Sequence, residues 1–479
     1  MSKESTASTL RLISRVILAT LASIFSIVTI CLLLSIAIIP PQYLWPVATL
    51  GFLLSALAGV GIFFASKKHR VRSVLACVLA IITIIVNIFA IYYFARVDTF
   101  ISDLQEVQPT TARYHHIILK SNQETYATPA NTNIALLATD SHMNDVKDFV
   151  QSELQATPTT APDATSLSLA ITGQTAPSAL VGDAHLALFE ENNADFFGSI
   201  IVIATYNIPI SNQPINTAKT SISDPFILYI SAIDVRTHDF PTSARSDLNI
   251  LLVVNPKTHQ ILSINTPRDY YVELPSFKAY DKLTHAGLYG VNESIKTLEN
   301  LYQTRIDYYV RANFDTLVDI VDVIGGIDVE LQANFTGYHD KYRFTKGWNH
   351  LSGPAAKDLA RERLSVSGGD LGRGKNQQLI IEAIFRKILQ PSMLIHANSI
   401  VDALANSAQT NLGSDNIKTF IYNQLDNMAH WDLQNIDAKV TSSQLHPTYS
   451  LGSQPLFIWW PNWDSIADIR AQITSYLQS

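Results

Sequence analysis

The chain has 479 residues, 47% of them hydrophobic, and a formal net charge of −7. The charge is uneven, because residues 1–100 hold eight Lys or Arg against two acidic residues, a net +6, which leaves −13 on the remainder. Such an acidic remainder excludes general nucleic-acid binding, which needs a broad basic face. The two cysteines, Cys31 and Cys77, lie in apolar runs, which excludes a disulfide framework and a cysteine metal site.

Three uncharged apolar segments, at residues 16–39, 43–65 and 74–95, open the chain. Each exceeds the roughly 20 residues that cross a bilayer as a helix, so we predict three transmembrane helices within residues 16–95. A cleaved signal peptide is the alternative for the first segment, but its apolar run is too long and two more segments follow.

Basic residues precede the first segment and separate the second from the third, namely Lys3, Arg11, Arg15, Lys67, Lys68, Arg70 and Arg72. The positive-inside rule therefore places a tail at residues 1–15 in the cytoplasm and everything after residue 96 outside the cell. We predict a multi-pass protein of the cell membrane whose large C-terminal region is extracellular.

Residues 98–220 form the next part of the sequence. Turn-rich polar stretches such as QATPTTAPDATS alternate there with apolar stretches such as GSIIVIATYNIPI, which favours a small mixed α/β domain. No chemistry can be assigned to this segment, so we predict an extracellular accessory domain.

From residue 225 the pattern changes to short, nearly continuous apolar strands, FILYISAI, NILLVVNP, QILSINTP and DYYVRAN. Amphipathic helical candidates such as NQQLIIEAIFRKILQ lie between and after them. This alternation predicts a three-layer α/β domain over residues 225–479. Its last part, residues 415–479, should add a helix, a strand at IDAKV and a closing helix at WDSIADIRAQITSYL.

Charged residues flank these predicted strands at three places: Asp234 with Arg236, Arg245 with Asp247, and Arg268 with Asp269. Strand ends are where α/β sheets usually keep their sites. Two aspartates beside several arginines suit a hard divalent cation that holds phosphate oxygens, and the arginine fork donates two hydrogen bonds to phosphate. Surface ion pairs are the alternative interpretation of each cluster.

A fourth cluster, within residues 353–378, places Arg361, Arg363, Arg373 and Lys375 beside glycines that precede a predicted helix start. Fixed cations next to a helix N-terminus make a receptor for a polyphosphate. The GDLGRGK segment has the spacing of a nucleotide-binding P-loop. However, Asn376 stands where that motif needs Ser or Thr, and a helix rather than a strand precedes it, so we reject the nucleotide interpretation.

The motifs ISAIDVR, ARSDLNILLVV, INTPRDYYV, DKLTHA, VDVIGGIDV and RERLSVSGGDLGRGKNQQ, in this order over about residues 225–390, resemble the LytR–CpsA–Psr (LCP) family. The apolar segments and the domain after them are similar to the streptococcal CpsA-type capsule biosynthesis members. The resemblance implies a three-layer α/β/α LCP domain with a central mixed sheet and an apolar lipid tunnel.

It also implies an enzyme of the Gram-positive cell wall, a phosphotransferase (EC class 2). Such an enzyme moves a capsular or related anionic glycopolymer, an exopolysaccharide, from a polyprenyl pyrophosphate carrier to peptidoglycan. The expected partners are the polyprenyl-pyrophosphate-linked polysaccharide, the peptidoglycan acceptor and the membrane, with no nucleic acid.

The same resemblance assigns roles to residues. The catalytic set is Arg268, Asp247 and Asp370. The metal-side carboxylates, for Mg²⁺ or another divalent cation, are Asp234 and Asp247. The pyrophosphate binders are Arg245, Arg268, Arg361, Arg363, Arg373, Gln377 and Lys282. The chain departs from the family at Asn376, where many members have a basic residue, with Lys375 one position earlier.

Two other functions stay open. With water in place of the peptidoglycan hydroxyl, the chain would be a polyprenyl-pyrophosphate-glycan hydrolase. With binding but no turnover, it would be a lipid-binding regulator of polysaccharide synthesis. Direct DNA contact is disfavoured, because the predicted cytoplasmic parts are too short for a DNA-binding fold.

Overall fold

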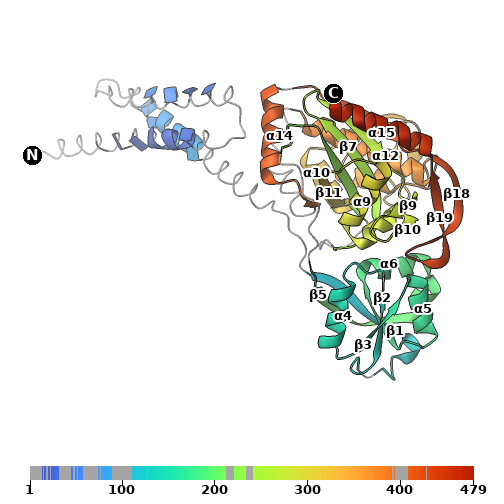
Figure 1. Cartoon of the computed structure of the whole chain (residues 1–479). Helices are drawn as coiled ribbons and strands as arrows, with labels where there is room; N and C mark the ends of the chain where they lie inside the picture. The colour runs from blue at the N-terminus through green and yellow to red at the C-terminus, as the bar shows by residue number, and fades with distance from the viewer. Residues whose placement is uncertain are drawn as a thin grey trace, which may run out of the picture. The chain divides into compact units, whose positions relative to one another are not determined.

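The computed structural model of the chain (Figure 1) describes residues 111–126, 128–211, 221–233, 241–390, 393, 408–427 and 429–479. It also describes helical stretches between residues 13 and 88, the longest at 23–31 and 77–88. The chain divides into two compact units, residues 1–105 with 414–429, and residues 106–413 with 430–479.

The first unit contains the N-terminal helical stretches. Asn87 Nδ2 donates to Ser26 Oγ at 3.3 Å and so connects stretch 77–88 to stretch 23–31. Within the described part of the chain, no helix is both long enough and apolar enough to cross a membrane. Much of each predicted transmembrane segment lies outside the described residues. Helix α14 (Ser414–Asn427), which the sequence predicted, also belongs to this unit.

The first part of the second unit, residues 111–211, is a small mixed α/β domain, which we call the accessory domain. Its five strands follow the order β3-β2-β4-β1-β5, with β2 parallel to β3 and β4, and β1 antiparallel to its neighbours. The elements are β1 (Thr111–Leu119), η2 (Lys120–Asn122), β2 (Asn133–Leu137), α4 (Met143–Ser152), β3 (Thr157–Ala161), α5 (Ala164–Thr172), β4 (Ser178–Gly182), α6 (Asp183–Asn192), α7 (Ala194–Ser199) and β5 (Ile200–Pro209).

The second part, which we call the large domain, is built on a mixed six-stranded sheet with the order β16-β11-β6-β7-β8-β17. β7 runs antiparallel to β6 and β8, whereas β11 is parallel to β6 and β17 is parallel to β8. These strands are β6 (Phe226–Ile233), β7 (Ser246–Asn255), β8 (Gln260–Asn265), β11 (Tyr308–Asn313), β16 (Ala408–Thr410) and β17 (Asp432–Asp437). Every residue of β7 is buried, as its apolar sequence predicts for a central strand. The predicted α/β class and mixed sheet are confirmed.

Smaller strand pairs and the helices complete the large domain. The strand pairs are β9 (Tyr271–Leu274) with β10 (Ala279–Lys282), β12 (Ile327–Leu331) with β15 (Gly347–Leu351), β13 (Phe335–Thr336) with β14 (Arg343–Phe344), and β18 (Val440–Thr448) with β19 (Gly452–Pro461). The helices are α8 (Leu283–Ala286), η3 (Gly287–Tyr289), α9 (Val291–Tyr302), α10 (Phe314–Val323), α11 (Gly353–Arg361), α12 (Asp370–Ile388) and α15 (Trp463–Gln478).

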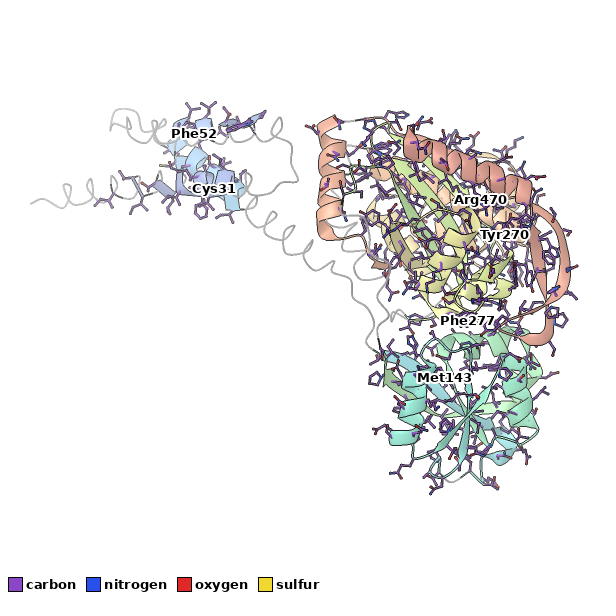
Figure 2. The ribbon with its side chains drawn as sticks, viewed as in Figure 1. Cys31, Phe52, Met143, Tyr270, Phe277 and Arg470 are labelled. Atoms are coloured by element: carbon purple, nitrogen blue, oxygen red, sulfur yellow. The ribbon has the colours of Figure 1, made fainter. Side chains whose placement is uncertain are left out.

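Helices cover both faces of the six-stranded sheet. Leu262 and Ile264 of β8 belong to an apolar cluster with α9 and α15, whereas Ser263 between them accepts hydrogen bonds from Gln378 of α12. Because successive strand side chains point to opposite faces, α9 and α15 lie on one face and α12 on the other. Arg470 of α15, labelled in Figure 2, donates to the Leu301 carbonyl oxygen at the end of α9, which ties these two helices together.

Two elements differ from the sequence prediction. Helix α12 begins at Asp370, so Gly372 and Gly374 lie within its first turns instead of ahead of it. The strand expected at IDAKV is β17, which already ends at Asp437, and the unpredicted β18–β19 hairpin follows it. A Cβ atom on Gly374 would lie 2.8 Å from the Asn265 amide, so glycine there lets α12 pack closely against the end of β8.

Three strand termini meet at one edge of the sheet. β6 ends where β7 begins, because Ile233 pairs with Ser246. β8 ends nearby, with Asn265 opposite Ile250. Because β7 runs antiparallel to β6 and β8, its first residues lie beside the last residues of those two strands. Charged residues that the sequence analysis found at separate strand ends are therefore brought to the same place.

Candidate functional site

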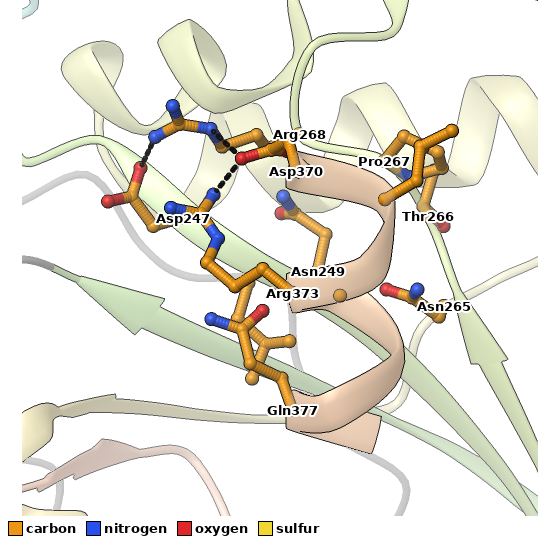
Figure 3. Close-up of a pocket in the computed structure, with 12 residues that line it drawn as sticks. Asp247, Asn249, Asn265, Thr266, Pro267, Arg268, Asp370, Arg373 and Gln377 are labelled. Atoms are coloured by element: carbon orange, nitrogen blue, oxygen red, sulfur yellow. Dashed lines mark hydrogen bonds and ion pairs between the residues drawn. The ribbon is translucent and has the colours of Figure 1, made fainter. Parts of the chain in front are cut away.

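A pocket opens at this edge of the sheet, between the start of β7, the end of β8 and the first turns of α12 (Figure 3). Polar and charged side chains dominate its lining, which consists of Asp247, Leu248, Asn249, Asn265, Thr266, Pro267, Arg268, Asp370, Leu371, Arg373, Gly374 and Gln377. Five predicted site residues are thus brought together: Asp247, Arg268, Asp370, Arg373 and Gln377.

Arg268 contacts three aspartates. Its Nη1 donates to Asp247 Oδ1 at 2.8 Å, and its Nε lies 3.4 Å from Asp370 Oδ1 and 3.9 Å from Asp269 Oδ2. Arg373 Nη2 lies 2.6 Å from the same Asp370 oxygen, so Asp370 stands between two guanidinium groups (Figure 3). These pairs connect the end of β8 with the start of β7 and the first turn of α12.

Two further predicted cations lie beside the pocket lining. Lys282, the last residue of β10, places Nζ 2.5 Å from Asp269 Oδ1. Arg245, the residue before β7, forms an ion pair with Glu191 of the accessory domain. Each of these cations therefore approaches the pocket already paired with a carboxylate.

The charges at the pocket stabilise one another. Burial by itself would raise the pKa of Asp247, but the positive charges of Arg268, Arg245 and Arg373 hold that pKa at about 2. Burial likewise disfavours charged Arg268, yet the neighbouring aspartates raise its pKa above the ordinary arginine value. Burial and the charge of Arg268 lower the pKa of Arg373. At neutral pH Asp247 is ionised, and arginine stays protonated in proteins.

Gln377 lies one turn after Arg373 on α12. Its Nε2 donates to the Ala360 carbonyl oxygen at 2.9 Å, which joins α12 to α11 at the pocket wall. Lys375 and Asn376 are not among the lining residues. Lys375 lies 3.8 Å from Asp437 with its side chain 65% exposed. The position where the chain departs from the family pattern therefore lies outside the pocket.

Arg361 and Arg363 are not part of the pocket lining either. The Arg361 guanidinium lies over the Phe314 ring, 5.5 Å from its centre, and Arg363 is exposed in the following loop. Glu362 between them is buried and accepts backbone hydrogen bonds from Tyr338 and Leu364. The loop is thus anchored by Glu362, and phosphate binding by the two arginines stays a prediction.

Sequence reasoning did not single out Asn249 or Asn265, and it named Asp269 only as a member of a charged cluster at a strand end. Asn249 accepts a hydrogen bond from Tyr229 at 2.6 Å, and Asn265 donates to Asp437 at 3.0 Å, while both line the pocket. Asp269 lies within ion-pairing distance of Arg268 and Lys282. Asn249 could have been singled out from the sequence, because it is a polar residue inside the otherwise apolar run LNILLVV.

A divalent cation fits the donor set only in part. Asp247 is ionised, lines the pocket and uses Oδ1 for its hydrogen bonds to Arg268 and Thr284, and no bond to Oδ2 occurs among the described residues. Mg²⁺ commonly takes only one or two carboxylates and completes its shell with water and phosphate. The described residues contain no group of three or more His, Cys, Asp or Glu suited to a metal ion. Asp234, the second predicted ligand, lies outside the described residues.

Comparison with known proteins finds a matching family model, similar relatives and similar solved structures. A model of the LytR_cpsA_psr family matches residues 205–454. The chain is 33% identical over 198 residues to the polyisoprenyl-teichoic acid–peptidoglycan teichoic acid transferase TagU of Bacillus cereus, covering 41% of this chain and 64% of that relative. It is 36% identical over 219 residues to the enzyme of the same name from Halalkalibacterium halodurans, covering 45% and 66%.

The matched segments thus span just under two thirds of these relatives. Among solved structures, B. subtilis TagV superposes with a TM-score of 0.46 at 24% identity, covering 53% of this chain and 98% of that one.

Proposed function

The chain belongs to the LytR_cpsA_psr family, and from that membership we propose that it is a transferase of the cell wall. It would move a capsular, teichoic-acid-like or related anionic glycopolymer from a polyprenyl pyrophosphate carrier to peptidoglycan. The names of the matched relatives, which are transferases of polyisoprenyl-linked teichoic acid to peptidoglycan, support the substrate class and the acceptor.

One observation carries this proposal: buried cations converge on a single open pocket. Arg268 and Arg373 line it with side chains only 12% and 10% exposed, and both lie against Asp370. Burying arginines costs free energy, which is offset when their fixed forks bind phosphate oxygens. The adjacent N-terminus of the 19-residue helix α12 adds a partial positive charge that favours the same ligand.

The proposed reaction is a displacement at phosphorus. A peptidoglycan hydroxyl oxygen attacks the phosphorus attached to the glycan, the bond from that phosphorus to the bridging oxygen breaks, and polyprenyl phosphate leaves with the electron pair. Arg268 and Arg373 stabilise the charge that spreads over the phosphoryl oxygens, and catalysis rests mainly on positioning and electrostatics. Asp370, between these arginines, is the candidate to receive the hydroxyl proton.

The charge balance supports a divalent cation as the cofactor. Around the pocket, Arg245, Arg268, Lys282 and Arg373 are matched by Asp247, Asp269, Asp370 and Glu191. A pyrophosphate brings further negative charge into this balanced set. Mg²⁺ held by Asp247 would supply compensating positive charge at the phosphate oxygens.

We place the protein at the cell membrane, with its N-terminus in the cytoplasm and both extracellular domains on the outer face. The long apolar segments of the sequence and their flanking charges support this topology. The apolar cluster of α10, α11 and α12, which includes Leu359 and Ile380, is the proposed lining for the polyprenyl chain. It lies next to Gln377 along α12.

The test is a reconstitution with purified full-length protein, a polyprenyl-pyrophosphate-linked glycan, peptidoglycan fragments and Mg²⁺. Covalent attachment of glycan to peptidoglycan supports the transferase. Release of free glycan would indicate the hydrolase instead, and binding without turnover the regulator. Chelation of divalent cations should stop transfer, and added Mg²⁺ should restore it.

A further inference from the structure

The accessory domain is packed against the large domain by a shared apolar cluster. Leu188 and Phe189 of α6 belong to the same buried cluster as Ala286, Leu288 and Leu451 of the large domain. Phe277, labelled in Figure 2, also packs against this cluster from the β9–β10 hairpin. The position of α6 relative to the large domain is therefore set by a common core.

Polar contacts fix the same junction. Thr165 Oγ1 donates to the Leu451 carbonyl oxygen at 2.5 Å, and Ala164 N donates to the Ser450 carbonyl oxygen at 3.1 Å. Gln454 Nε2 donates to the Asn192 carbonyl oxygen at 2.6 Å, which holds the last residue of α6. The C-terminal turn of α6 thus has a defined place on the large domain.

Glu191 lies in that turn and forms an ion pair with Arg245. Arg245 differs from the other cations of the site in its partner. Arg268, Lys282 and Arg373 pair with aspartates of the large domain, whereas Glu191 is the carboxylate within ion-pairing distance of Arg245 among the described residues.

The backbone beside Arg245 is fixed, but its side chain faces repulsion. Ala244 N donates to the Gly287 carbonyl oxygen at 3.0 Å, which anchors the chain just before Arg245. Arg245 precedes Asp247 by two residues, and Asp247 accepts a hydrogen bond from Arg268 at 2.8 Å. Two guanidinium groups that act on one anion repel each other before the anion arrives, and a carboxylate paired with one of them offsets that repulsion.

We infer that Glu191 is a positioning residue of the pyrophosphate site, which acts through Arg245 from the accessory domain. It holds the Arg245 guanidinium beside Arg268, ready for the anion, and does not itself touch the substrate. The accessory domain thereby contributes a functional group to the site. This inference rests on the proposed function, because it takes the pyrophosphate as the ligand of Arg245.

The test compares Glu191→Gln with Glu190→Gln in the full chain. Glu190 is the matched control, since it is the preceding residue of α6, is exposed, and has no ion pair among the described residues. Binding of geranylgeranyl pyrophosphate with Mg²⁺, measured by calorimetry, should weaken about three- to fivefold in Glu191→Gln, as expected for one partly exposed ion pair. In transfer assays KM should rise by a similar factor, with kcat nearly unchanged.

A double-mutant cycle with Arg245→Gln separates this role from a general loosening of the domains. If Glu191 acts through Arg245, Glu191→Gln should have no further effect on binding in the Arg245→Gln background. If the losses of binding free energy in the two single variants add up in the double variant, the inference is overturned. Tighter binding by Glu191→Gln would also overturn it, because Glu191 would then compete with the phosphate for Arg245. Wild-type protein that fails to bind the probe would overturn the proposed function. If the wild-type protein binds the probe and the Glu191→Gln and Glu190→Gln variants bind it with the same affinity, only the inference about Glu191 is overturned.

Discussion

Arg268 donates from Nη1 to Asp247 Oδ1 across 2.8 Å, and this bond joins the end of β8 to the start of β7. The two side chains are only 12% and 7% exposed. A buried ion pair of this kind matters for stability as well as for function, because burying either charge without the other costs free energy.

Arg268→Ala should therefore destabilise the protein by on the order of 3 kcal/mol, since it leaves the Asp247 carboxylate buried without its main partner. Adding Asp247→Asn should recover part of that loss. Urea denaturation measures both free energies of unfolding. Lys257→Ala is the surface control, because the Lys257–Asp224 pair is 60% and 59% exposed and should contribute less than about 1 kcal/mol. Equal losses in Arg268→Ala and Lys257→Ala would contradict the buried-pair account.

Arg373→Ala should lower the transfer rate at least about 100-fold, the usual effect of removing a group that stabilises developing charge. The expected loss in Arg363→Ala is much smaller, because Arg363 is exposed and does not line the pocket. Steady-state transfer assays give both rates. A larger effect at Arg363 would mean that its loop moves into the pocket when substrate binds.

Gly374→Ala should destabilise the large domain by about 1–3 kcal/mol through overpacking, because its Cβ would lie 2.8 Å from the Asn265 side chain. Gly198→Ala is the matched control, with no atom within 4 Å of the added Cβ. Thermal unfolding compares the two variants. If Gly374→Ala kept wild-type stability and activity, the close packing of α12 on β8 would not matter for the site.

His116 should make the protein acid-sensitive. Burial lowers its pKa to about 4, so the folded state favours the neutral ring. The unfolded chain binds the proton near pH 6.5, so this contribution to stability is full above pH 6.5 and is lost as the pH falls towards 4. His116→Gln should flatten the dependence of unfolding free energy on pH in that window. His350→Gln, at a side chain 61% exposed, should keep the wild-type slope, and a steep slope in His116→Gln would refute the assignment.

The strands of the large sheet were predictable because their sequences are nearly continuous apolar runs. FILYISAI is β6 residue for residue, and the first residue of β11 is one position into DYYVRAN. The start of α12 was missed because glycine usually marks a turn, whereas here Gly372 and Gly374 serve close packing within a helix. The β18–β19 hairpin was missed because β18 is mostly exposed and lacks an apolar face.

The positions of the site residues were predictable where these residues follow strand ends. The prediction was poor where they lie in loops. Asp247 and Arg268 meet because the register of β7 with β8 brings them to one edge. Arg361 and Arg363 were expected beside Arg373, but the turn after α11 that Glu362 anchors leaves them outside the pocket lining. No local pattern could link Glu191 to Arg245, since that contact arises only from the packing of two domains.

The most direct measurement is the fate of a radiolabelled glycan supplied on polyprenyl pyrophosphate to the purified full-length protein with peptidoglycan fragments and Mg²⁺. Our account predicts that the label becomes covalently attached to peptidoglycan and that Arg373→Ala slows this attachment at least about 100-fold. Label that stays on the lipid, or that appears only as free glycan, in the presence of the wild-type protein would contradict the proposed transfer.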